Sequence, residues 1–155
     1  MDGKYYRLFR TGTLVVALLT VLILSLGLYS RGSAQYIDLN IKFPFLSGPT
    51  WKIVQGYNTT YTHTGYQRYS HDYIRDDGAQ SGQWVTAPIA GYVAWGGTTT
   101  QAQGCISLRS TTSTNYRVML CHINFITNYN VGDYVSQGWL LGTVAPPGHK
   151  GNNGT

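Results

Sequence analysis

Glutamate is absent from this chain, and charge of either sign is scarce. The 155 residues include six aspartates, eleven lysines and arginines and four histidines, and only 11% of all residues are charged. Without glutamate, the HExxH helix of the commonest zinc proteases is excluded, together with every glutamate general base. Glycosidase chemistry requires paired carboxylates, and only the few aspartates of this chain could provide them.

The positive charge is concentrated at the N-terminus. Four basic residues and one acidic residue fall within the first 34 positions, so this segment accounts for +3 of the net charge of +5. The remaining chain has seven basic and five acidic residues, a balance of +2. Such a balance does not indicate a surface for nucleic acid, which is therefore not an expected partner.

A basic start is followed by an uncharged, hydrophobic segment from Thr11 to Ser30. Twenty helical residues span about 30 Å, the thickness of a hydrocarbon core, so residues 1–34 can form a transmembrane signal anchor as a leader helix. They can equally form a signal peptide, with Gly32 and Ala34 as the small residues before the cleavage site. In both cases we expect the following residues to be exported to the cell envelope or the medium, with membrane contact only through an uncleaved leader.

The rest of the chain, residues 35–155, is typical of one antiparallel all-β domain. Val, Ile, Thr and Tyr alternate with polar residues, and clusters of Gly, Asn and Asp interrupt these runs. No amphipathic helix of ten or more residues is expected. The expected strands are 50–57, 70–75, two strands within 84–97 joined at Ala87-Pro88, 105–110, 115–123, 133–137 and 139–145.

A turn at residues 111–114 predicts a hairpin with a defined register. In that register Ile106 faces Leu120 and Leu108 faces Val118, which makes one face of the hairpin apolar. A half-buried antiparallel strand pair requires such a face.

The same register sets Cys105 opposite Cys121, the two cysteines of the chain. Cross-strand Cβ atoms lie about 4.5–5.5 Å apart, which small adjustments bring within reach of a disulfide. Two buried free thiols are the alternative. The register also places Arg109 opposite Arg117, and this like-charge pair argues against the register.

Two histidines and three aspartates fall within residues 62–77, THTGYQRYSHDYIRDD. We expect His63 on a loop or at a strand edge and Asp72 in a short strand, from where the two side chains can supply two ligands to zinc. A polar loop beside a strand is the alternative interpretation. His71 would face the opposite side of that strand from Asp72 and is expected to be packed or solvent-exposed.

The two other histidines lie near strand ends or in loops. His122 ends the segment YRVMLCHI, where a hydrogen-bonded residue at the rim of the sheet is the alternative to a functional one. His149 lies in APPGHKGNNGT, which is typical of a solvated loop.

Four segments, in this order, resemble the LytM/lysostaphin-type zinc metallopeptidases: THTGYQRYSHDY, GQWVTAPIAGYVAWGG, YRVMLCHI and NVGDYVSQGWLLGTVAPPG. The similarity covers about residues 44–155. It implies a β-sandwich-like LytM domain, also called a duplicated hybrid motif. His63 and Asp72 correspond to the first two zinc ligands, and His122 corresponds to the catalytic histidine beside the metal. The implied activity is zinc-dependent hydrolysis of peptide bonds in peptidoglycan stems or cross-links, by a monomer.

The chain departs from the family pattern in two places. The interval of nine residues between His63 and Asp72 is longer than the common one, which leaves His71 as a rival ligand. The closing HxH strand, which supplies the third zinc ligand and a second catalytic histidine, does not occur before Thr155. We therefore predict that the domain is C-terminally incomplete and inactive as an endopeptidase in this form.

Two alternatives of different class remain. The first is a non-catalytic LytM-like module that binds peptidoglycan or a partner cell-wall hydrolase. The second is a β-sandwich or carbohydrate-binding domain unrelated to proteases, in which His63, Asp72 and His122 would lie far apart.

Overall fold

The computed structural model describes residues 37–60 and 62–152. The predicted leader, residues 1–34, lies outside these described residues, so its nature stays a prediction. Ile37–Thr155 form one compact unit. Within the described ranges, no helix combines the length and the apolar character needed to cross a membrane.

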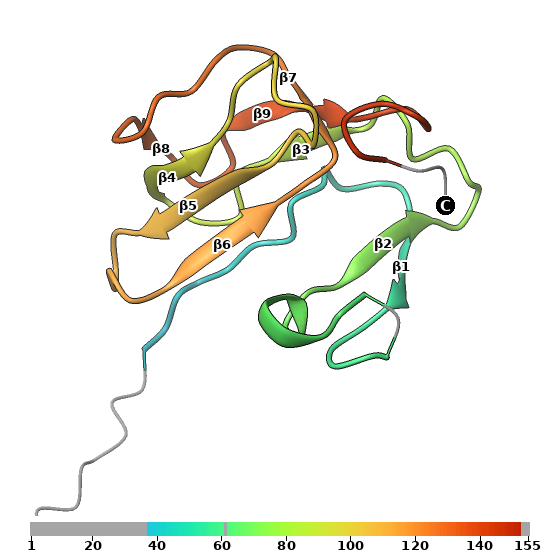
Figure 1. Cartoon of the computed structure of the whole chain (residues 1–155), viewed down its shortest axis with the longest axis horizontal. Coiled ribbons are helices and arrows are strands. Elements are labelled where there is room, and N and C mark those ends of the chain that lie inside the picture. Colours follow the sequence, from blue (N-terminus) through green and yellow to red (C-terminus); the bar gives the residue numbers. More distant parts are fainter. Residues whose placement is uncertain (1–36, 61, 153–155) are drawn as a thin grey trace, which may run out of the picture. The chain divides into compact units, whose positions relative to one another are not determined.

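The described residues form nine strands and one short 3-10 helix (Figure 1), so the all-β prediction is confirmed. The elements are β1 (Trp51–Gln55), η1 (Gly65–Gln67), β2 (Asp72–Arg75), β3 (Trp84–Thr86), β4 (Gly91–Gly96), β5 (Ile106–Ser110), β6 (Arg117–Leu120), β7 (Ile123–Phe125), β8 (Tyr134–Val135) and β9 (Leu140–Val144).

These strands pair in three sheets, and every pairing is antiparallel. β1 and β2 form a two-stranded sheet, β9 lies between β3 and β7, and the third sheet has the order β6-β5-β4-β8. The two strands expected within residues 84–97 are thus β3 and β4, and they belong to different sheets. The buried link Ala87-Pro88 lies in the connection between them.

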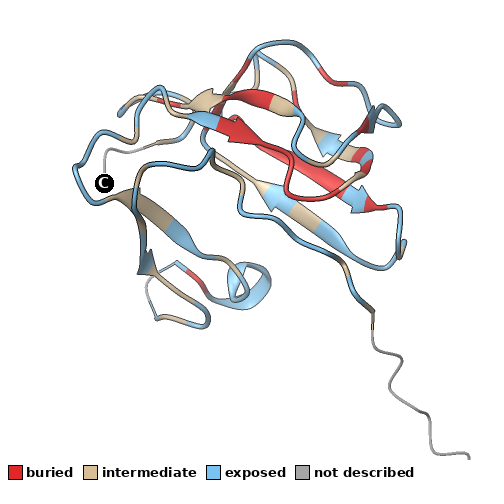
Figure 2. Ribbon diagram, turned by 180° about the vertical axis from the view of Figure 1, so that it is seen from behind, coloured by how far each residue is buried: buried red, intermediate tan, exposed pale blue. Residues whose placement is uncertain are grey.

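The two larger sheets share one hydrophobic core. It includes Val93, Ile106 and Leu108 from the four-stranded sheet and Ile123 and Leu141 from the three-stranded sheet, and each of these side chains is at most 2% exposed. Figure 2 shows the buried residues in these sheets and only intermediate or exposed residues in β1 and β2. Hydrophobic burial therefore stabilises the larger sheets directly, whereas the two-stranded sheet lies outside the core.

The predicted register of the β5–β6 hairpin is confirmed. Ile106 pairs with Leu120 and Leu108 pairs with Val118. Ile106 and Leu108 are buried, and their two partners are half-buried residues that pack against the core. The apolar face of the hairpin therefore covers the core, as the alternation of residues required.

The disulfide allowed by this register is also present, since Cys105 is bonded to Cys121. The like-charge pair that argued against the register is present as well. Arg109 faces Arg117 across the two strands, and both residues are exposed. Solvent and salt weaken the repulsion between exposed charges, so apolar burial and the disulfide outweigh it.

The prediction of one strand over residues 115–123 is wrong. The chain leaves the four-stranded sheet after Leu120 and enters the three-stranded sheet at Ile123. Between them, His122 has a φ of 64°, in the left-handed region. A strand cannot continue through this conformation, so the backbone turns a corner at His122.

Candidate metal site

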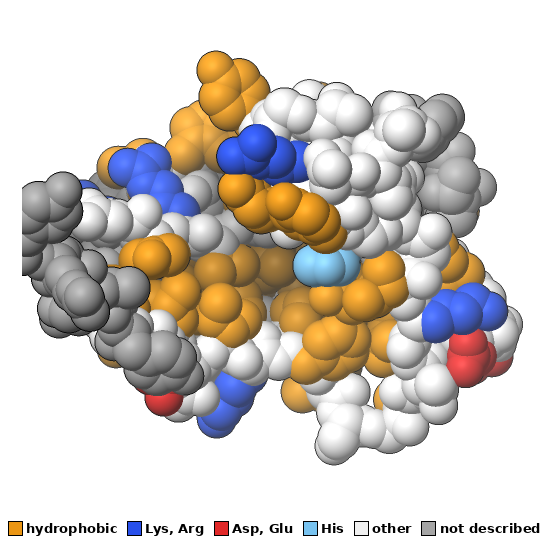
Figure 3. Space-filling model, turned by 90° about the horizontal axis from the view of Figure 1, so that it is seen from below, with side chains coloured by type: hydrophobic (Ala, Val, Ile, Leu, Met, Phe, Trp, Pro, Cys, Tyr) orange, Lys and Arg blue, Asp and Glu red, His pale blue; other side chains and the backbone are white. Residues whose placement is uncertain are grey.

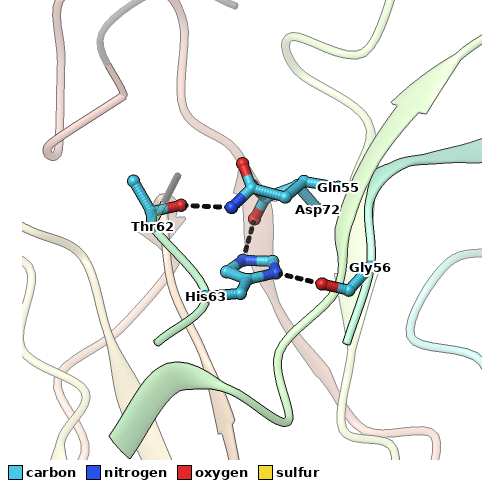
Figure 4. A network of polar contacts seen from close by, with 5 residues as sticks. All are labelled: Gln55, Gly56, Thr62, His63 and Asp72. Atoms are coloured by element: carbon cyan, nitrogen blue, oxygen red, sulfur yellow. Dashed lines mark hydrogen bonds and ion pairs between the residues drawn. The ribbon is translucent and has the colours of Figure 1, made fainter. Parts of the chain in front are cut away.

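The structure brings His63 and Asp72 together. His63 lies in the loop between β1 and η1, and Asp72 is the first residue of β2. The ring atom Nε2 of His63 lies 3.3 Å from Oδ1 of Asp72 (Figure 4). This is the residue pair for which the sequence predicted two metal ligands.

A bulge in β1 places Gln55 opposite Asp72. The register shifts between Ile53 and Gln55, so Gln55 pairs directly with Asp72. Paired residues point to the same side of a sheet, and the shift therefore aims both side chains at the loop. The Gln55 amide lies 2.6 Å from Oγ1 of Thr62, the residue before His63, and ties the loop to β1.

His63 and Asp72 differ strongly in exposure. The His63 side chain is 4% exposed, whereas that of Asp72 is 50% exposed. The imidazole is therefore fixed inside the loop, while the carboxylate opens to solvent. A catalytic metal site needs this combination, because one coordination position must remain accessible to water or substrate.

The backbone fixes the tautomer of His63. Nδ1 lies 2.8 Å from the carbonyl oxygen of Gly56. A carbonyl oxygen can only accept a hydrogen bond, so Nδ1 carries a proton and donates it. In the neutral ring, Nε2 then has a lone pair and no proton. The Asp72 carboxylate that it faces can also only accept a hydrogen bond. This contact is favourable only when a second proton or a cation lies between the two atoms.

The separation of Nε2 and Oδ1 is compatible with a long hydrogen bond and also with a shared metal ion. A hydrogen bond between imidazolium and carboxylate has a length of about 2.7–2.9 Å. Two ligand atoms on a tetrahedral zinc, with bonds of about 2.0–2.2 Å, lie roughly 3.3–3.6 Å apart. The 3.3 Å between His63 and Asp72 falls in the second range. Hydrogen bonding of Nδ1 to a backbone carbonyl is also the usual support of a zinc-bound histidine.

The donor set therefore fits two ligands of a zinc site. Within residues 37–60 and 62–152, no group of three or more His, Cys, Asp or Glu side chains is placed to hold a metal ion. Zinc requires a third and usually a fourth ligand, which a water, a substrate or a further protein residue can supply.

His122 lies at the exposed corner between β6 and β7, and no hydrogen bond joins it to His63 or Asp72 within the described part of the chain. Its Nδ1 lies 3.2 Å from the carbonyl oxygen of Lys150. As at His63, a carbonyl oxygen can only accept, so Nδ1 donates and Nε2 keeps its lone pair. His122 therefore presents a basic nitrogen to solvent.

Within the described residues, no hydrogen bond or ion pair joins either of the two remaining histidines to the pair. His71 is exposed and precedes β2, with its ring 6.2 Å from that of Tyr73. His149 is exposed in a turn, where its backbone N–H donates to the carbonyl oxygen of Pro146. The geometry favours His63 over His71 as the partner of Asp72.

Sequence reasoning missed Gln55 and Gly56, which position the pair. The bulge that turns Gln55 toward Asp72 had no signal in the alternation of residues, and a backbone carbonyl acceptor leaves no trace in the sequence. The burial of His63 was also missed, because its neighbours are polar and predicted an open loop.

Two exposed tyrosines lie close in sequence to Gly56 and Asp72. Tyr57 follows Gly56 directly, and its ring lies 5.5 Å from that of Tyr69; both side chains are exposed. The guanidinium of Arg68 lies 4.8 Å from the centroid of the Tyr69 ring. Exposed aromatic rings of this kind are suited to contact with a ligand. On the face seen in Figure 3, hydrophobic side chains gather across the middle.

Comparisons of the chain with protein-family models, with curated proteins and with solved structures found no match. The resemblance to LytM-type peptidases therefore stays a prediction, which rests on the four segments quoted above.

Proposed function

We propose that this chain is the domain of a zinc-dependent endopeptidase that hydrolyses peptide bonds in peptidoglycan stems or cross-links, with His63 and Asp72 as zinc ligands and His122 as the catalytic histidine. Because the described residues supply only two protein ligands, we expect the chain alone to be inactive. The observation that supports it most is the lone pair of a buried His63 Nε2 facing a carboxylate oxygen at 3.3 Å. The ordered resemblance to LytM-type peptidases supports the substrate class.

Each residue has a defined chemical role in this proposal. A bound zinc ion would polarise the scissile carbonyl and lower the pKa of a water molecule. His63 is held by Gly56 in the tautomer that can bind a metal, and Asp72 adds negative charge at the solvent side. Because the chain contains no glutamate, a histidine must move the proton. Nε2 of His122 is free to accept it.

The test is the zinc content of the full chain after equilibration with zinc and removal of the excess. We expect about one zinc per chain in the wild type, and loss of zinc in His63→Ala and Asp72→Ala. His71→Ala and His149→Ala are the matched controls, because each removes an exposed imidazole outside the pair. Zinc that persists in His63→Ala, or that is lost in His71→Ala, contradicts the ligand assignment.

Activity needs a separate measurement. New amino termini released from purified peptidoglycan report endopeptidase cleavage. We expect none from the wild-type chain alone, because its described residues supply two zinc ligands and no third. His122→Ala should retain zinc, since His122 is proposed to act on the proton and not on the metal; loss of zinc would show that His122 has a different role. Zinc-dependent cleavage by the wild-type chain would overturn the prediction of inactivity.

A second function, that of a non-catalytic module binding peptidoglycan or a partner hydrolase, is favoured by one observation. The described residues offer no third protein ligand for the metal. This function predicts that the chain sediments with peptidoglycan without bound zinc, and that sedimentation is unchanged in His63→Ala, Asp72→Ala and His122→Ala.

A further inference from the structure

The solvent face of the four-stranded sheet has a row of four exposed side chains that the proposed zinc site does not use. Arg117 pairs with Arg109, Arg109 pairs with Tyr92, and Tyr92 pairs with Tyr134. Paired residues in an antiparallel sheet point to the same side. The four side chains therefore form one line across β6, β5, β4 and β8, in the strand order seen in Figure 1. We call this line the Arg-Tyr row.

The aromatic half of the row is open to solvent. Tyr92 is 42% and Tyr134 is 56% exposed, and their rings meet edge to face with centroids 5.5 Å apart. Trp95 extends this surface along β4: it pairs with Ser107, which lies two positions from Arg109 and so on the same face. The Trp95 side chain is 48% exposed. Three large aromatic side chains thus offer their rings on one face of the sheet.

The cationic half has no partner within the described residues. Neither Arg109 nor Arg117 forms an ion pair or a hydrogen bond through its side chain there. Two like charges directly opposite one another destabilise a sheet. Folding gains nothing from this pair, yet its two planar guanidinium groups are well suited to bind a carboxylate through paired hydrogen bonds.

We propose that the Arg-Tyr row binds a sugar polymer whose repeating unit carries a carboxylate. The apolar faces of sugar rings would pack on Tyr92, Tyr134 and Trp95, while Arg109 and Arg117 bind the carboxylate. The proposal does not depend on the zinc site, and it holds equally for an enzyme and for a binding module.

Other polyanions fit the row less well. A nucleic acid has a phosphate at every nucleotide, and the proteins that bind it present a continuous basic groove. The Arg-Tyr row has only two cationic side chains, and the net charge of the residues after Ala34 is only +2. An acidic peptide would satisfy the arginines but would leave the open aromatic surface without a matching group.

The test is calorimetric titration of the full chain with a hexamer of galacturonic acid. We expect saturable binding that becomes at least about tenfold weaker in the Arg109→Gln/Arg117→Gln variant, because two charge-assisted contacts are lost. Lys42→Gln is the matched control, because Lys42 is exposed and its side chain has no hydrogen bond or ion pair within the described residues. Its affinity should remain that of the wild type.

The aromatic half has its own variant. Tyr92→Ala should weaken binding severalfold, whereas Tyr66→Ala, at a fully exposed tyrosine of η1, should not. Thermal unfolding excludes damage to the fold: Arg109→Gln removes the like-charge pair, so it should raise the unfolding midpoint slightly while it weakens binding.

Four results would overturn the proposal. The first is no binding of the galacturonic acid hexamer at millimolar concentration, and the second is equal binding of an uncharged glucose hexamer. The third is equal or tighter binding of hexaglutamate or of a short oligothymidylate. The fourth is unchanged affinity in the double arginine variant. The second and third results would show that the sheet recognises sugar without charge, or charge without sugar.

Discussion

Different interactions stabilise the two larger sheets and the β1–β2 hairpin of this protein. The larger sheets enclose side chains that are at most 2% exposed, and a disulfide closes the β5–β6 hairpin. In the β1–β2 hairpin and its loop, His63 is the one buried residue among positions 51–60 and 62–75. Apolar burial stabilises the first region, and hydrogen bonds to a histidine organise the second.

A two-stranded hairpin is marginally stable on its own. Here Phe45 connects it to the core: its ring stacks on Trp51 of β1 with centroids 3.6 Å apart, and its backbone forms a bridge with Val85 of β3. The ring of Phe45 also lies 6.1 Å from that of Tyr73 in β2. The candidate metal site thus lies on the less stable region, and aromatic contacts couple this region to the more stable one.

The largest effect is expected from the core. Ile106→Ala removes a fully buried side chain and should lower the free energy of unfolding by about 2–5 kcal/mol. Ile53→Ala, at an exposed position of β1, should change it by less than about 1 kcal/mol. Urea unfolding of both variants measures the difference. Similar losses would show that the hairpin contributes to the core after all.

The disulfide should rank next. Cys105→Ser/Cys121→Ser opens a covalent loop with a sequence separation of 16 residues, which should cost about 3 kcal/mol. Urea unfolding of the wild type with and without a reductant provides the matching measurement. If the reduced wild type unfolds at the same urea concentration as the oxidised protein, the bond does not contribute to stability.

A smaller and local effect is expected at the contact between the regions. Phe45→Ala removes the ring that stacks on Trp51 and should cost roughly 1–3 kcal/mol, less than a fully buried phenylalanine, since Phe45 is half-buried. Amide hydrogen exchange should accelerate in β1 and β2 and stay unchanged in β5. Leu46→Ala, at an exposed neighbour, is the control. Uniform acceleration in all strands would contradict the separation of the two regions.

The smallest effect depends on pH. Burial raises the pKa of the Tyr129 phenol, against a weaker opposing hydrogen bond with Trp139. The unfolded chain therefore loses this proton first, at the ordinary pKa of 10.0, so the contribution of Tyr129 is complete below pH 10 and is lost as the pH rises beyond it.

Tyr129→Phe tests this contribution. It removes the hydrogen bond to the carbonyl oxygen of Leu140 and should cost about 1 kcal/mol at neutral pH. Its stability deficit relative to the wild type should shrink above pH 10, as measured by urea unfolding across that range. A deficit that stays constant or grows would contradict the effect of burial.

The accuracy of sequence reasoning also differed between the two regions. In the larger sheets, a turn at residues 111–114 and the alternation of apolar residues predicted the pairing of Ile106 with Leu120. The same register set Cys105 opposite Cys121 and left free thiols as the alternative to the bond that is present. The opposed arginines argued the other way and were misleading, because an exposed repulsion is weaker than apolar burial. The break at His122 was missed, since a left-handed backbone at a residue other than glycine has no clear sequence signal.

In the hairpin, the sequence predicted which residues would meet but not how they meet. The residue types of His63 and Asp72 made them possible ligands, and the resemblance to LytM-type peptidases was the basis for proposing them as a pair. The burial of the ring, the Gly56 carbonyl that fixes its tautomer and the bulge opposite Asp72 all depend on the path of the loop. Loop paths are set by many weak contacts, which residue patterns do not determine.

The left-handed backbone at His122 limits how this corner can change during evolution. Besides glycine, asparagine and aspartate adopt that conformation most readily. A histidine codon becomes an asparagine codon through a single-nucleotide change, which would keep the turn between the two sheets and remove the imidazole. Descendants of this protein can therefore lose the imidazole without losing the fold. Under the proposed function, a single mutational step at His122 would convert an enzyme of this architecture into a binding module.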